Sequence, residues 1–173
     1  MKKLVIAAAI IAAGVGGVSY ANYVATQEVR AEVDKQLALV SEQTGASFNY
    51  AALSASVISN SVAISNIEVT SPEGDKIATV EHVEVTGYET DKISPHTAFT
   101  LKNFQFDKSF VDTLPADTNT QLASASYDLH SSLDYDEQSG NSDIVVKLQA
   151  NDIASIDMDM GLANSKALMD ASL

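Results

Sequence analysis

Two eight-residue stretches of this sequence share one pattern of apolar residues, and this pattern constrains the fold more than any other feature. They are residues 62–69, VAISNIEV, and residues 99–106, FTLKNFQF. In each stretch every second residue is a large apolar one, the alternation slips by one position at an asparagine, and it then resumes. Alternation places every second side chain on one face of a β-strand. The slip would turn the second half outward unless a β-bulge absorbs the extra residue.

We therefore predict two bulged or bent strands that share one apolar face of a sheet. The residues of this predicted face are Val62, Ile64, Ile67, Val69, Phe99, Leu101, Phe104 and Phe106.

Five further stretches also have a period of two, which is typical of strands. They are residues 48–53, 77–88, 123–135, 143–150 and 153–160. Turn-forming residues separate several of them, as in SPEGD at residues 71–75. The longest break, residues 112–120 with Pro115 inside, predicts a loop. Because most of these stretches are apolar on one side only, they indicate an antiparallel sheet with one wet face.

Residues 25–44 have a helical period instead. Val29, Val33, Leu37 and Val40 lie at spacings of four, four and three, which gives one apolar stripe, and Gly45 follows as a natural stop. The stripe predicts packing on the sheet. The expected fold class is α+β: an N-terminal helix followed by a curved antiparallel sheet of about seven strands with bulges.

The N-terminal segment is uncharged from residue 4 to residue 27, after Lys2 and Lys3, and its apolar centre covers residues 4–18. Two interpretations stay open. It is a signal peptide cleaved near Ala21, or an uncleaved anchor, whose length as a helix, roughly 36 Å, exceeds the ~30 Å of a bilayer core. The basic start and the acidic residues from Glu28 onward place the body outside the cytoplasm in both cases. The expected organisation is an anchor or signal segment at 1–24, an amphipathic helix at 25–45 and an antiparallel β domain at 46–173.

Charge and cysteine content exclude several classes of function. The net charge is −13, which excludes nucleic acid as a partner, because such binding needs clustered Lys and Arg. There is no cysteine, and therefore neither a disulfide nor a cysteine-based metal site.

The polar residues offer weak candidates for chemistry. The three histidines are far apart in sequence, and we expect them at the surface: His82, His96 and His130. An acidic cluster suggests calcium but does not match the EF-hand template, so it predicts a solvated hairpin tip. Its members are Asp134, Asp136, Glu137, Asn141 and Asp143. Asp157 and Asp159 share one face, with no pocket to tune their pKa. We therefore expect no enzyme activity, no cofactor and no metal.

The order of these parts resembles the N-terminal region of AsmA-like bacterial envelope proteins and of the YdgA-type family (the DUF945 group). The resemblance covers roughly residues 1–110 and rests on the basic-apolar anchor, on Phe48-Asn-Tyr50 and on residues 62–67. It implies a periplasmic β protein tethered to the inner membrane through residues 4–24, with a sheet curled into a groove for acyl chains. It favours an uncleaved anchor and supplies no catalytic residues. Members are usually longer, and no closing strand is evident at the C-terminal end, so we expect a short relative or a piece truncated there.

Two functions follow as expectations, and the resemblance favours the first. In the first, the apolar face stays partly open and binds lipid or another apolar ligand in envelope maintenance. In the second, the helix at 25–44 closes that face, and the protein is an envelope scaffold or interaction module for another envelope protein. Exposure of the predicted face separates them, because a large exposed apolar patch marks a binding site.

Overall fold

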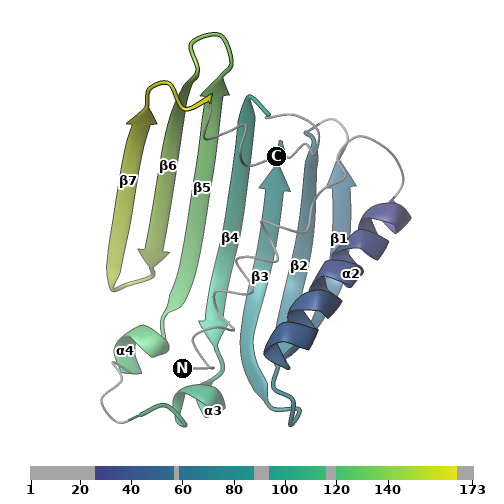
Figure 1. Ribbon diagram of the computed structural model, residues 1–173. Coiled ribbons are helices and arrows are strands. Elements are labelled where there is room, and N and C mark those ends of the chain that lie inside the picture. The colour runs from purple at the N-terminus through teal and green to yellow at the C-terminus, as the bar shows by residue number, and fades with distance from the viewer. Residues whose placement is uncertain (1–25, 57–58, 88–93, 116–119, 167–173) are drawn as a thin grey trace.

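The computed structural model describes residues 26–56, 59–87, 94–115 and 120–166. One helix precedes a sheet of seven antiparallel strands, whose spatial order follows the order in the chain (Figure 1). The elements are α2 (Thr26–Thr44), β1 (Ser47–Ser56), β2 (Ser61–Thr70), β3 (Lys76–Thr86), β4 (His96–Phe106), α3 (Lys108–Val111), α4 (Thr120–Ala123), β5 (Ser126–Asp136), β6 (Asn141–Ala150) and β7 (Ala154–Leu162).

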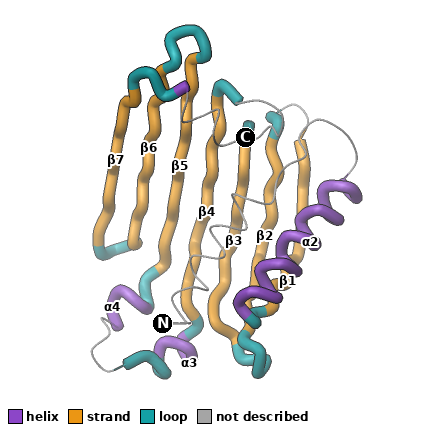
Figure 2. Tube along the Cα trace, in the orientation of Figure 1, coloured by secondary structure: helices purple, strands orange, loops and turns teal. Residues whose placement is uncertain are grey.

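The predicted fold class is confirmed, and the predicted strands agree with the observed ones to within a few residues. Helix α2 ends at the expected glycine, since Gly45 adopts φ +76° and its N–H donates to the Ser41 carbonyl at 2.7 Å. One correction concerns Ala123, which was expected to open a strand and instead ends α4. The two short helices α3 and α4 flank the predicted loop between β4 and β5 (Figure 2).

The anchor or signal segment at 1–24, including the membrane-spanning stretch at 4–24, lies outside the described residues. Within the described ranges, no helix combines the length and the apolar character needed to cross a membrane.

The regular pairing of the strands is interrupted where the sequence pattern slips, at Asn66 on β2 and Asn103 on β4. We call this part of the sheet the crease. Asn66 and Asn103 both adopt a left-handed backbone, with φ +53° and +52°, a conformation that asparagine tolerates better than most residues. Along β2 and β3 the paired positions run to Ser65 and resume at Ile67 in the same register, so Asn66 and Glu81 face each other without a ladder pair.

Of the two asparagines, only the second lies in a bulge. Between β4 and β5 the register shifts by one, because Lys102 and Asn103 together lie opposite Asp128. The prediction of a bulge at Asn66 was wrong in this respect. Ala51 on β1 and Glu81 on β3 lie opposite Asn66 and are also unpaired in the ladder. Each strand therefore has one residue at this position, and the register does not shift.

Candidate functional site

The predicted apolar face exists, and it is largely covered. Ile64 and Ile67 lie on the same side of the sheet, because Ile64 pairs with Leu53 and Val83 and Ile67 pairs with Tyr50 and Val80, all within one core cluster. Six of the eight predicted residues are buried, and the other two are half-buried. The buried six are Val62, Ile67, Val69, Phe99, Leu101 and Phe104, and the half-buried two are Ile64 and Phe106.

The face extends further than the sequence repeats indicated. Residues directly opposite each other in antiparallel strands share one face, so the registers trace rows of side chains across the sheet. One row is apolar on all seven strands: Leu53, Ile64, Val83, Leu101, Leu129, Leu148 and Ile156. The next row runs through Val62, Val85, Phe99, Ser131, Val146 and Met158. The apolar face therefore belongs to the whole sheet.

Helix α2 lies over one end of this face. It crosses in front of β1 (Figure 1), and its Val29 and Val33 are buried in the same cluster as the sheet residues, with Leu37 packed against it. The predicted stripe on the helix is thus confirmed as a packing surface.

A polar contact fixes the position of α2 on the sheet. The Tyr50 hydroxyl donates to Asp34 Oδ1 at 2.6 Å, which joins β1 to the helix. Burial, and after it this hydrogen bond, raise the pKa of Tyr50 to about 12. The neutral hydroxyl is therefore the form that the folded protein favours.

At the other end of the face, the apolar side chains are exposed. Along the first row, Val83 and Leu101 are buried, Leu129 and Leu148 are half-buried, and Ile156 is 57% exposed. Met158 and Met160, also on β7, are 43% and 40% exposed. Their alternation with Asp157 and Asp159 is visible in the sequence, but a sequence pattern gives no sign of whether another element covers the strand.

The crease carries a network of polar groups. The Asn103 backbone N–H donates to Asp128 Oδ1 at 2.7 Å, and its side-chain amide donates to Glu81 Oε2 at 3.0 Å. Asn151 Nδ2 donates to Ser126 Oγ at 2.8 Å, beside the other oxygen of Asp128. The bond to Asp128 satisfies the Asn103 N–H, which the bulge removes from the hydrogen-bond ladder. The role of this network is therefore structural.

All three histidines lie on the opposite, polar face of the sheet, because each is next in its strand to a position on the apolar face. His82 is near Ser65 and Glu84, and His130 Nδ1 is 3.1 Å from Thr100 Oγ1. The histidines are far apart in the sequence, which gives no sign that they share a face. The registers of the strands place them on one face.

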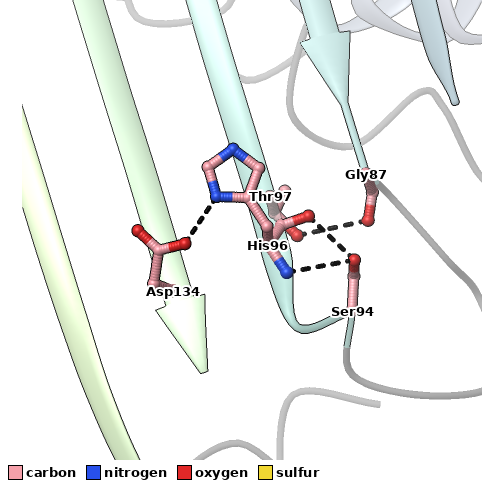
Figure 3. Close-up of polar contacts among 5 residues, drawn as sticks. All are labelled: Gly87, Ser94, His96, Thr97 and Asp134. Atoms are coloured by element: carbon pink, nitrogen blue, oxygen red, sulfur yellow. Dashed lines mark hydrogen bonds and ion pairs between the residues drawn. The ribbon is translucent and has the colours of Figure 1, made fainter. Parts of the chain in front are cut away.

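His96 makes the shortest contact of the three, and Figure 3 shows its surroundings. Its Nδ1 lies 2.6 Å from Asp134 Oδ1, a carboxylate–imidazole pair that a hydrolytic triad would use. The nearby Ser94 hydroxyl, however, donates to the His96 backbone carbonyl at 2.8 Å and accepts from its N–H, away from the ring (Figure 3). Ser94 is therefore a backbone brace at the start of β4, and this imidazole does not activate it.

The acidic cluster lies at the β5–β6 hairpin, as predicted. Asp136 Oδ1 accepts from the Gln138 N–H at 2.9 Å, and Oδ2 accepts from the Ser139 hydroxyl at 2.8 Å. The Ser139 hydroxyl, and after it the backbone N–H groups of Gln138 and Ser139, hold the pKa of Asp136 below its usual range. In the described part of the chain, no three histidine or acidic side chains converge on a position that could hold a metal ion.

No protein-family model matches the chain, and no curated protein matches it significantly.

Proposed function

We propose that this protein is a non-enzymatic interaction or scaffold module of the bacterial envelope. The observation that supports this proposal is the burial of the predicted apolar face: six of its eight residues, on β2 and β4, are less than a tenth exposed. A closed core of this kind leaves the outer surfaces of the sheet to make contacts with other proteins.

A second function is favoured by a different observation. The apolar rows continue past the covered region to Ile156, Met158 and Met160, which are exposed. A lipid acyl chain could lie along this end of the face, where exposed apolar area marks a binding surface. In this alternative the protein binds lipid or another apolar ligand in transport or envelope maintenance.

Lipid analysis separates the two functions. The full-length protein would be extracted from bacterial envelopes in mild detergent and examined by native mass spectrometry. The interaction-module proposal expects protein free of stoichiometric lipid. Lipid that co-purifies at one molecule per chain and is lost in Met158→Asp would support the second function. The matched control is Leu39→Asp, which changes an exposed apolar residue of α2.

We further propose that residues 4–24 tether the module to the inner membrane, with the body in the periplasm. A carbonate wash should then leave the protein in the membrane fraction with its N-terminus intact. An N-terminal sequence that begins at Asn22 would show cleavage after Ala21 and a body without a tether.

A further inference from the structure

Strand β7 is a long and regular edge of the sheet. It pairs with β6 in one unbroken register, from Ala154 opposite Ala150 to Leu162 opposite Ser142. It contains no proline, no lysine and no bulge, three of the devices that commonly protect edge strands. The opposite edge differs, since α2 lies against β1 (Figure 1). Within the described residues, the outer side of β7 has no strand or helix beside it, and its outward backbone groups are free to pair.

The two faces of β7 define what could pair with it. Ile156, Met158 and Met160 project on the apolar face and are exposed, so an added strand with apolar residues at alternate positions would extend the apolar rows. Asp157 and Asp159 project on the other face. Lys147 of β6 lies opposite Asp157, but within the described residues neither aspartate forms an ion pair. An added strand would therefore place its intervening residues beside two carboxylates, which favours lysine or arginine there.

A second copy of this chain fits the edge poorly. Two β7 strands related by a two-fold axis perpendicular to the sheet keep their apolar faces together. In the register that pairs the whole strand, Ala154 lies opposite Leu162, and Asp157 of each copy lies opposite Asp159 of the other. Like charges directly opposite each other destabilise a strand pair, and the net charge of −13 adds to the repulsion.

We propose that β7 binds an extended segment of a partner protein in which apolar residues alternate with lysine or arginine, by strand addition. This inference rests on the proposed interaction function and names its surface and the chemistry of its partner. Backbone hydrogen bonds supply affinity in this mode of recognition, and the alternating side chains supply selectivity.

The test uses two fluorescent peptides as long as β7, one alternating valine with lysine and the other valine with glutamate. Their binding to the full-length protein in detergent would be followed by anisotropy. The lysine peptide should bind at least about tenfold more tightly, and its affinity should fall as salt rises. The double variant Asp157→Lys with Asp159→Lys should reverse the preference. The double variant Glu73→Lys with Glu137→Lys makes the same charge change at exposed turns and should leave the preference unchanged.

Several results would overturn the proposal. Equal affinity for the two peptides, or a reversal that the control variant also shows, would remove its charge basis. A dimer that forms with rising concentration and competes with the lysine peptide would assign the edge to a second copy. Absence of peptide binding by lipid-free protein would overturn strand addition and leave the interaction-module proposal standing, whereas stoichiometric lipid would count against that proposal itself.

Discussion

Replacing Asn66 by alanine should destabilise the protein through the backbone alone. Asn66 is exposed, its φ is +53°, and no hydrogen bond from its side chain is among the described contacts. A left-handed conformation costs an ordinary L-residue roughly 1–2 kcal/mol, a cost that asparagine partly avoids and glycine avoids entirely. We therefore expect Asn66→Ala to lower the free energy of unfolding by about 1 kcal/mol, or about 2–4 °C in melting temperature for a chain of this size. Asn66→Gly should stay within about 0.5 kcal/mol of the wild type.

The assay is urea unfolding followed by far-ultraviolet circular dichroism, since the chain has no tryptophan. Asn49→Ala is the matched control: Asn49 is also an exposed strand asparagine, but it is not among the residues with positive φ. It should change stability by less than about 0.5 kcal/mol. Equal losses in Asn66→Ala and Asn66→Gly, or no loss in either, would refute the argument that the left-handed backbone at the crease selects asparagine.

Three other predictions follow from the closed core, from the link between helix and sheet, and from the hairpin. Ile67→Asp should lower the free energy of unfolding by more than about 4 kcal/mol, because an unpaired charge would enter the core. Ile67→Val should lower it by only about 1 kcal/mol. If urea unfolding gave similar losses for the two variants, the site at Ile67 would be open to solvent. The folded pKa of Tyr50, about 12, is above the ordinary value of about 10, so its contribution to stability is complete below pH ~10 and is lost as pH rises toward 12. Tyr50→Phe should remove that part of the alkaline loss, and an unchanged pH profile would contradict it. Melting curves with calcium and with a chelator should superimpose, and a rise of several degrees with calcium would indicate a site at residues 134–143.

The sequence predicts the elements of this fold well because their signals are local. Helical spacing marks α2, and Gly45 marks its end. Period-two alternation marks the seven strands, and the slip at each asparagine marks the crease. Each of these signals depends on residues close together in the chain, so tertiary contacts are not needed to interpret them.

The register between paired strands could not be predicted from such local signals. Asn66 and Asn103 have the same sequence pattern, yet only Asn103 lies in a bulge, because the outcome depends on the partners opposite them. Asn66 has one residue opposite it on β3, Glu81, so the register is kept. On β5 the single residue Asp128 lies opposite both Lys102 and Asn103, so the register shifts. A bulge depends on the residues of both paired strands, so the pattern within one strand does not show it.

The candidate site was predicted in part for the same reason. The two repeats identify the covered half of the apolar face, on β2 and β4. The exposed half depends on which strand lies at the edge, which is a property of the assembled sheet. The alternation of Ile156 and Met158 with acidic residues was visible, but it does not distinguish an edge strand from a covered one.

Hydroxyl-radical footprinting of the full-length protein tests most directly the claim that the apolar face is closed at β2–β4 and open at β7. The oxidation rate of each residue would be measured by mass spectrometry in the folded and the urea-unfolded protein. We expect Met158 and Met160 to stay reactive in the folded protein, and Phe99 and Phe104 to be strongly protected, in line with their exposure. Protection of Met158 equal to that of Phe99 would show that β7 is covered, and fast oxidation of Phe104 would show that the core is open; either result would contradict the account.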